Sequence, residues 1–290
     1  MYDAIYQTSH ISPGSISFND TANLNKTQTL TITNHGDSIA WYEIFNQVSI
    51  TIDPYNQTGE TSAYGFNAPV KYINGSTAHL RFSRKTIKVS PGSSTEVKIT
   101  VTPPDIDPKL HIMYSGFIEF KSKLPNKNKD MTVPYIGIVG NQRELPIFDK
   151  EITRIEDSEY YYDLDELITF NPKNESTTPV VVLGLTTPSK LIVFRLYEHN
   201  TKKELGYALK PYKYANRSTG AKPIVGAFVW DGSYYEKLPP SEEERTLPDP
   251  AKHKVKPGKY QIVAQALKLL GDPNNKRDWE DWTSNVIEVV

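Results

Sequence analysis

Hydrophobic and polar residues alternate in several short segments of the first half of the chain. In residues 29–33, Leu30 and Ile32 fall on one face, and residues 96–102 and 116–121 repeat this period of two. Such alternation places one face of a β-strand on a core and the other face in water. No helical period competes with it over this half, so the pattern predicts antiparallel β-structure.

Turn signals separate these segments. Pro-Gly pairs stand at residues 13–14, 91–92 and 257–258, where proline presets φ and glycine supplies the positive φ of a tight turn. Residues 34–37 read Asn-His-Gly-Asp and are predicted to form a hairpin turn between two strands. Many short strands with regular turns are typical of a β-sandwich.

The strand pattern restarts in the second half, at residues 180–185, 191–197 and 224–230. Residues 260–270 fit either a helix or a strand, and the Pro-Gly turn before them favours the strand. Residues 278–282 are expected to form one helical turn before a last strand.

The two patterned halves predict an all-β protein of two tandem antiparallel β-sandwiches, Ig-like or fibronectin-III-like. The expected domains are residues 1–142 and 150–290, and residues 143–149 are the expected linker. The length of 290 residues allows two domains, and a hydrophobic content of 38% lets each half bury its own core.

Charge and cysteine content exclude several classes of function. The formal net charge is −1 and the basic residues are spread along the chain, so no nucleic acid is expected as a partner. The absence of cysteine excludes disulfides, Cys-ligated zinc and thiol catalysis. The most apolar stretch, residues 180–194, is too short for a membrane span and contains Pro188.

Six Asn-x-Ser/Thr sequons indicate secretion and are candidate N-glycosylation sites. They begin at Asn19, Asn25, Asn56, Asn74, Asn174 and Asn216. Residues 1–11 have neither the charged n-region nor the apolar h-region of a signal peptide. We therefore expect an extracellular protein, secreted or in a cell wall, whose signal peptide is missing from this chain. The alternative is an intracellular protein with idle sequons.

No catalytic, cofactor-binding or metal-binding residue is predicted. Residues 35–38 contain an imidazole, a carboxylate and a hydroxyl, but neighbours in one turn cannot form the directed hydrogen bonds of a serine protease. The histidines are isolated, so no zinc site is expected. An acidic stretch could bind calcium, but it lacks the glycine-turned loop of an EF-hand, and a solvated acidic segment is the favoured interpretation. It comprises Glu156, Asp157, Glu159, Asp163, Asp165 and Glu166.

Aromatic residues in the second half allow two interpretations. Flat rings on the surface would stack on sugars, which suggests a free-standing adhesion or carbohydrate-binding protein. Packing in the core and between sheets is the favoured interpretation, because sandwiches place their large aromatics there. The residues concerned are Tyr160, Tyr161, Tyr162, Trp230, Tyr234, Tyr235, Trp279 and Trp282.

Segments along the whole chain, in order, carry a family resemblance. Those in the first half are residues 14–21, 29–34, 89–97, 102–104, 114–118 and 133–140. Those after it are residues 145–149, 230–232, 257–260, 271–275, 278–282 and 284–287. The first set resembles the Fn3-like domain, of the C5a-peptidase type, that follows the catalytic domain of fungal subtilisin-like serine proteases. The second set resembles the linker and the terminal Ig-like module of such proteins.

This resemblance implies a non-catalytic, C-terminal accessory region of a secreted serine endopeptidase. Its partners would be a subtilase catalytic domain upstream in the same polypeptide and protein substrates. The family's catalytic Asp, the His in a His-Gly-Thr-His context and the Ser in a Gly-Thr-Ser-Met context are absent from this sequence. No catalytic residue can therefore be carried over. The expected role is to stabilise the catalytic domain and to help bind protein substrate.

Overall fold

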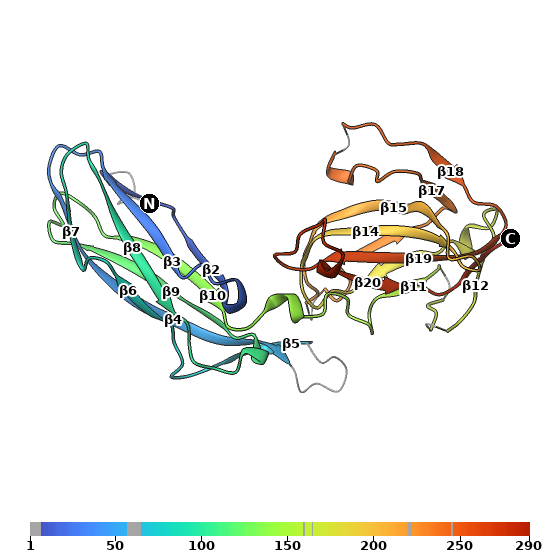
Figure 1. The fold of residues 1–290 in the computed structure, drawn as a ribbon, viewed down its shortest axis with the longest axis horizontal. Helices are drawn as coiled ribbons and strands as arrows, with labels where there is room; N and C mark the ends of the chain where they lie inside the picture. The colour runs from blue at the N-terminus through green and yellow to red at the C-terminus, as the bar shows by residue number, and fades with distance from the viewer. Residues whose placement is uncertain (1–6, 57–64, 159, 164, 220–221, 245) are drawn as a thin grey trace. The chain divides into compact units, whose positions relative to one another are not determined.

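The computed structural model describes all residues except 1–6, 57–64, 159, 164, 220–221 and 245, and shows an all-β protein of β-sandwich type (Figure 1). Contacts within the chain divide it into two compact units. The first unit is built from Met1–Tyr55 and Asn67–Asn141, and the second is built on Gln142–Val290. No helix of the described residues has the length and hydrophobicity needed to cross a membrane. Each unit has its own hydrophobic core.

Two sheets enclose the core of the first unit. One sheet has the order β1-β3-β8-β6, and the other has the order β2-β10-β9-β4-β5, with β7 paired to β4. The strands are β1 (Ser9–Ser12), β2 (Ile16–Asp20), β3 (Thr27–Asn34), β4 (Ala40–Asn56), β5 (Gly65–Tyr72), β6 (His79–Phe82), β7 (Thr86–Val89), β8 (Ser94–Thr102), β9 (Met113–Ser122) and β10 (Met131–Ile138). The alternating segments of the sequence lie in β3, β8 and β9, and Leu30 and Ile32 are fully buried.

Two tyrosines pack on glycines between β9 and β10. Tyr135 lies opposite Gly116, and Tyr114 lies opposite Gly137. A Cβ atom at Gly137 would lie 2.2 Å from the Tyr114 hydroxyl, and one at Gly116 would lie 2.4 Å from the Tyr135 hydroxyl. The absence of a side chain at these glycines thus makes room for the buried rings.

The predicted hairpin turn at residues 34–37 is wrong. β3 and β4 lie in different sheets, so this segment crosses from one sheet to the other. The buried Asn34 side chain holds the crossing: its amide donates to the carbonyls of Ser38 (2.8 Å) and Val89 (3.0 Å), and its oxygen accepts from the Gly36 N–H. The local turn signal was present, but it could not identify the sheet in which the next strand lies.

The second unit also has two sheets, one of three strands and one of eight. The smaller has the order β11-β13-β16, and the larger has the order β12-β21-β19-β14-β15-β17-β18, with β20 paired to β19. The strands are β11 (Arg154–Glu156), β12 (Ile168–Phe170), β13 (Val180–Leu183), β14 (Ser189–Glu198), β15 (Glu204–Ala215), β16 (Gly226–Val229), β17 (Ser233–Tyr235), β18 (Lys252–Lys254), β19 (Gly258–Leu267), β20 (Trp279–Thr283) and β21 (Ile287–Val289).

The helical elements are single turns of 3₁₀ helix. They are η1 (Thr21–Asn23), η2 (Pro108–Leu110), η3 (Gln142–Glu144), η4 (Glu175–Thr177), η5 (Glu242–Glu244) and η6 (Lys276–Asp278). The strand favoured for residues 260–270 is confirmed by β19 for residues 260–267, and a turn follows it. The helical turn expected at residues 278–282 is wrong, because η6 ends at Asp278 and β20 begins at Trp279.

Residues 143–149, for which the sequence predicts a linker, pack onto the second unit. Ile147 and Phe148 are buried in its core. Their N–H groups donate to the two carboxylate oxygens of Glu280, at 2.9 and 3.1 Å. We call residues 145–149 the strap. The Glu280 side chain ties it to β20, and backbone hydrogen bonds tie it to residues 184–186.

Candidate functional site

Residues 35–38 do not form a catalytic arrangement. The His35 ring stacks on that of His10, with 4.8 Å between the ring centres. Throughout the described part of the chain, no group of three or more His, Asp or Glu side chains is placed to hold a metal ion.

The acidic stretch is held by internal contacts. Asp157 accepts from the Tyr160 N–H and the Tyr162 hydroxyl, and Glu156 forms an ion pair with Arg154 at 2.9 Å. Glu166 accepts from the N–H of Asp163. Glu159 lies outside the described residues. These contacts stabilise the turns after β11.

The sequons differ in their accessibility. Asn25, Asn74, Asn174 and Asn216 are exposed, and the side chain of Asn56 lies outside the description. Asn19 is half-buried with a φ of 60°, and its amide donates to the Asn23 carbonyl at 3.4 Å. The four exposed asparagines are therefore the better candidates for glycan attachment.

Most of the large aromatics of the second unit are structural. Trp230 is fully buried, its Nε1–H donates to the Ser233 carbonyl at 2.8 Å, and Tyr235 and Trp282 are nearly buried. Tyr160 and Tyr161 are exposed, and Trp279 is half-buried. Core packing, with Tyr162 and Tyr234 packed at its edge, thus accounts for all the aromatic residues noted in the sequence except Tyr160, Tyr161 and Trp279.

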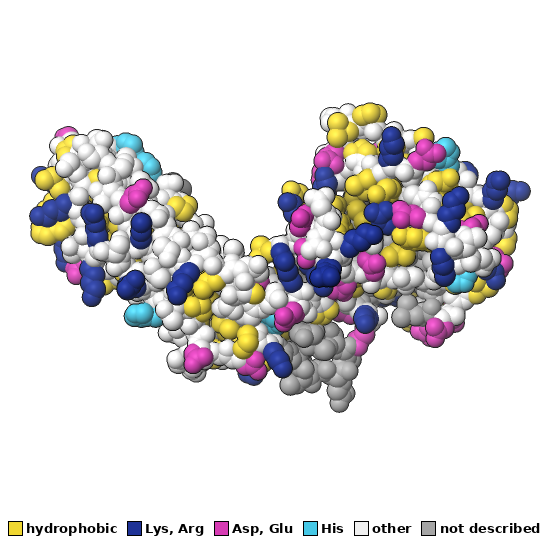
Figure 2. Space-filling model, in the orientation of Figure 1, with side chains coloured by type: hydrophobic (Ala, Val, Ile, Leu, Met, Phe, Trp, Pro, Cys, Tyr) yellow, Lys and Arg dark blue, Asp and Glu magenta, His cyan; other side chains and the backbone are white. Residues whose placement is uncertain are grey.

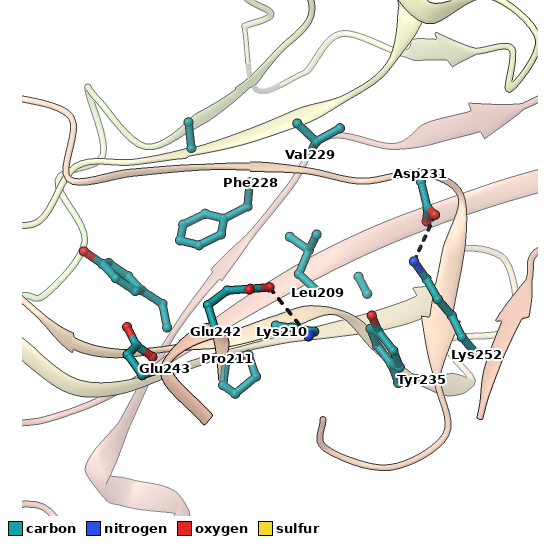
Figure 3. Close-up of a pocket in the computed structure, with 13 residues that line it drawn as sticks. Leu209, Lys210, Pro211, Phe228, Val229, Asp231, Tyr235, Glu242, Glu243 and Lys252 are labelled. Carbon is teal, nitrogen blue, oxygen red and sulfur yellow. Dashed lines mark hydrogen bonds and ion pairs between the residues drawn. The ribbon is translucent and has the colours of Figure 1, made fainter. Parts of the chain in front are cut away.

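A groove of about 480 Å³ lies where the two sheets of the second unit meet (Figure 3). We call it the seam groove; it is lined by residues 208–212 of β15, 227–229 of β16, Asp231, Tyr235, Glu242, Glu243 and Lys252. Leu209 and Phe228 give it an apolar interior. The Phe228 ring packs against those of Phe194 and Tyr212, at 4.9 and 5.3 Å between ring centres.

Ion pairs flank this apolar interior, as the dashed lines in Figure 3 show. Lys210 pairs with Glu242 at 3.6 Å and with Asp249 at 3.1 Å, and its hydrogen bond to Asp249 raises the pKa of the lysine. Lys252 pairs with Asp231 at 2.9 Å. Burial alone would raise the pKa of Asp231, but the hydrogen bond and the charge of Lys252 outweigh it and lower that pKa.

Strand edges without a strand partner border the seam groove. Among the described residues, β16 is the last strand of its sheet, and β17 pairs with β15 at Tyr207 and Tyr235 alone. The Trp230 N–H donates to the Pro179 carbonyl, and bonds in an antiparallel ladder involve every second residue. The N–H and C=O groups of Ala227 and Val229 therefore point away from β13. An extended polypeptide could add to such an edge.

The first unit exposes an apolar patch on the outer face of its larger sheet. Phe45, Phe117 and Ile136 are 43%, 41% and 41% exposed. Phe117 lies between Gln47 and Pro134 in the strand register, which places Phe45 and Ile136 diagonally on either side of it. We call these three residues the outer patch. Contiguous exposed apolar side chains are typical of surfaces that meet another protein.

Sequence reasoning found neither the seam groove nor the outer patch. Their residues come from strands distant in the sequence and meet only through register and sheet order. A local signal for the seam groove was Pro211, because proline lacks an N–H and suits a β-bulge or a strand edge, and the pairing of β15 with β14 shifts register at this position.

Comparison with known proteins identifies one region. Residues 16–136 match the sequence model of the Fn3-like domain. No curated protein is similar enough in sequence to count as a relative.

Several solved structures resemble the chain at low sequence identity. The class 5 fimbriae chaperone CfaA shares 10% identity with a TM-score of 0.36, covering 95% of this chain and 98% of its own. The E. coli chaperone DraB shares 11% identity with a TM-score of 0.28, covering 97% of this chain and 96% of its own. A PapD-like domain of human CEP192 shares 14% identity with a TM-score of 0.32, covering 47% of this chain and 86% of its own.

Proposed function

Starting from an Fn3-like domain at residues 16–136, we propose that the chain is a non-catalytic, C-terminal accessory region of a secreted subtilisin-like serine endopeptidase. The observation that carries the proposal is the match of this domain model. The ordered resemblance along the rest of the chain supports it. The region stabilises the catalytic domain by packing on it and holds segments of protein substrate; proteolysis itself belongs to the catalytic domain.

The outer patch offers a surface for the catalytic domain. Phe45 and Phe117 belong to strands β4 and β9, which pair with each other inside the sheet. Burying two such rings removes apolar surface from water, which stabilises a packed pair of domains by roughly 25 cal/mol per Å² of apolar surface.

The seam groove offers a place for an extended segment of protein substrate. Its free β16 edge supplies backbone hydrogen bonds, and Leu209 and Phe228 lie in the apolar interior between the two edges. Backbone bonding of this kind depends little on the sequence of the bound segment.

The exposed sequons support a secreted protein. A glycan on Asn25, Asn74, Asn174 or Asn216 would meet no buried surface, because these side chains are exposed. Mass spectrometry of the natively expressed protein would show whether these four asparagines carry glycans.

The reading frame upstream of Met1 in the native transcript is the first test of the protease role. An open frame with the three subtilase segments would support it, and a stop codon directly before a genuine start would contradict it.

The second test adds this region to the subtilase catalytic domain encoded upstream. We expect the added region to raise the melting temperature of the catalytic domain. It should also lower KM for a protein substrate while leaving KM for a short peptide unchanged. Phe45→Ser with Phe117→Ser should remove the gain in melting temperature, and Ala227→Pro should raise KM for the protein substrate alone. Ala227→Ser, which keeps the N–H, is the matched control. Unchanged stability and kinetics on adding the region would refute the proposed role.

A further inference from the structure

A second hollow, which we call the outer trough, lies on the outer face of the eight-stranded sheet. Side chains of β15, β14, β19 and β20 line it, together with Leu238 and residues of the loop 273–276. Its volume of about 670 Å³ falls within the range typical of ligand sites. Figure 2, in the orientation of Figure 1, shows hydrophobic, cationic and anionic side chains mixed over the visible face of the second unit.

Trp279 provides an aromatic surface in the outer trough. Along β20 the side chains alternate, so Trp282 enters the core while Trp279 and Asp281 belong to the outer face. The Nε1–H of Trp279 donates to the Pro273 carbonyl at 3.1 Å, which holds the half-buried indole in one orientation. A fixed aromatic ring suits the apolar face of a sugar ring, because little side-chain freedom is lost on stacking.

A ladder of hydrogen bonds runs across the strands beside this indole. Arg195 donates from Nε to the Gln265 Oε1 at 2.6 Å, and the Gln265 amide donates to Asp281 Oδ1 at 3.0 Å. At the other end, the Tyr197 hydroxyl donates to Glu204 at 3.1 Å, and Arg195 pairs with the same carboxylate. These bonds fix the orientation of the amide and carboxylate groups. An amide can donate to and accept from a sugar hydroxyl, and a carboxylate can accept from one.

The charges that line the trough balance. Arg195 and Lys276 carry two positive charges, and Glu204 and Asp281 carry two negative charges. The lining therefore attracts neither a polyanion nor a polycation, while carboxylates, amides and one ammonium group are available to uncharged hydroxyl-bearing molecules.

We propose that the outer trough binds a neutral polysaccharide, with Trp279 stacking on a sugar ring and Gln265 and Asp281 bonding its hydroxyls. The site does not depend on the protease role: a free-standing protein and an accessory region could both use it. In either case it would hold the chain on a solid carbohydrate surface.

The test measures binding of the 290-residue chain to insoluble chitin, β-glucan and mannan. We expect retention on at least one of the three, with competition by the soluble oligosaccharide of the same sugar. Trp279→Ala should weaken binding about tenfold or more, whereas Trp279→Phe, which keeps a ring, should lose less. Tyr161→Ala removes an exposed ring that does not line the trough and should bind like the wild type.

Gln265→Leu provides a second variant that leaves Trp279 in place, and it should also weaken binding. The melting temperature of each variant separates lost binding from lost folding. The proposal is wrong if none of the three polysaccharides retains the wild-type chain. It is equally wrong if folded Trp279→Ala and folded Gln265→Leu both bind as tightly as the wild type.

Discussion

The cross-strand contact of Tyr114 with Gly137 decides how closely β9 and β10 can pack. The ring occupies the space in which any other residue at position 137 would place its Cβ. Gly14, by contrast, has no atom within 4 Å of such a Cβ. The two glycines therefore separate the effect of packing from that of backbone freedom.

We predict that Gly137→Ala lowers the free energy of unfolding by about 1–3 kcal/mol, because the Tyr114 ring must move within a filled core. Gly14→Ala should change it by less than about 0.5 kcal/mol. Urea unfolding of both variants measures the difference. Equal effects of the two substitutions would contradict this account of the contact.

Tyr135 makes the free energy of unfolding of the first unit depend on pH in the alkaline range. Burial raises the pKa of its hydroxyl from 10.0 to about 12, although the hydrogen bond to Asn46 opposes the shift. The folded chain thus keeps a proton that the unfolded chain releases between these values. The stabilising contribution is complete below pH 10.0 and is lost as the pH rises towards about 12.

We expect the free energy of unfolding to fall more steeply with pH in the wild type than in Tyr135→Phe over this alkaline window. Urea unfolding at a series of pH values measures the slope. Tyr214→Phe, which changes a tyrosine that is 73% exposed, is the matched control. A wild-type slope equal to that of Tyr135→Phe would disprove the assignment.

At the scale of elements, one carboxylate joins the strap to β20. Glu280→Ala would leave the N–H groups of Ile147 and Phe148 without their acceptors beside a buried core. We predict a loss of about 2–3 kcal/mol in the free energy of unfolding, since hydrogen bonds to charged groups contribute about 1.5–3 kcal/mol. Glu280→Gln keeps one acceptor and should lose less.

Protease cleavage in the strap offers an independent measurement for Glu280→Ala. The strap, then held only by its bonds to residues 184–187, should open more often, so cleavage within residues 145–149 should become faster before the rest of the second unit unfolds. Unchanged stability and unchanged cleavage would show that the two hydrogen bonds contribute little.

The period-two pattern predicted the interior strands well, because alternation directly reports one buried and one exposed face. β3, β8 and β19 follow it. The pattern failed where pairing with a distant strand decides whether a segment is a strand and which sheet it joins. Residues 279–282 have a short helix-compatible spacing, yet pairing with β19 makes them a strand. The turn residues 34–37 are likewise compatible with a next strand in the same sheet and with one in the opposite sheet.

At the scale of the whole molecule, the two cores are separate sets of residues. We predict that residues 1–141 and 142–290, expressed separately, each fold with a cooperative thermal transition, because each unit buries a core of its own. Circular dichroism and calorimetry would measure this. A half that stays unfolded alone, while the full chain folds, would contradict the prediction.

The candidate sites could be predicted only in part from the sequence. The sequons and the aromatic residues were visible, but the sequence could not separate Trp279, on the outer face, from Trp230, in the core. The seam groove and the outer trough each combine several strands, so no local spacing encodes them. Sheet order and register, which arise from the whole chain, place these side chains together.

The distribution of tryptophan makes the two units optically unequal. Trp230, Trp279 and Trp282 belong to the second unit, and Trp41 alone belongs to the first. Fluorescence excited near 295 nm would therefore report mainly on the second unit. Trp230, which is fully buried, should emit at shorter wavelength than an exposed tryptophan. A Trp41→Phe chain would make this emission a selective reporter, so that the melting of one unit could be followed inside the intact protein.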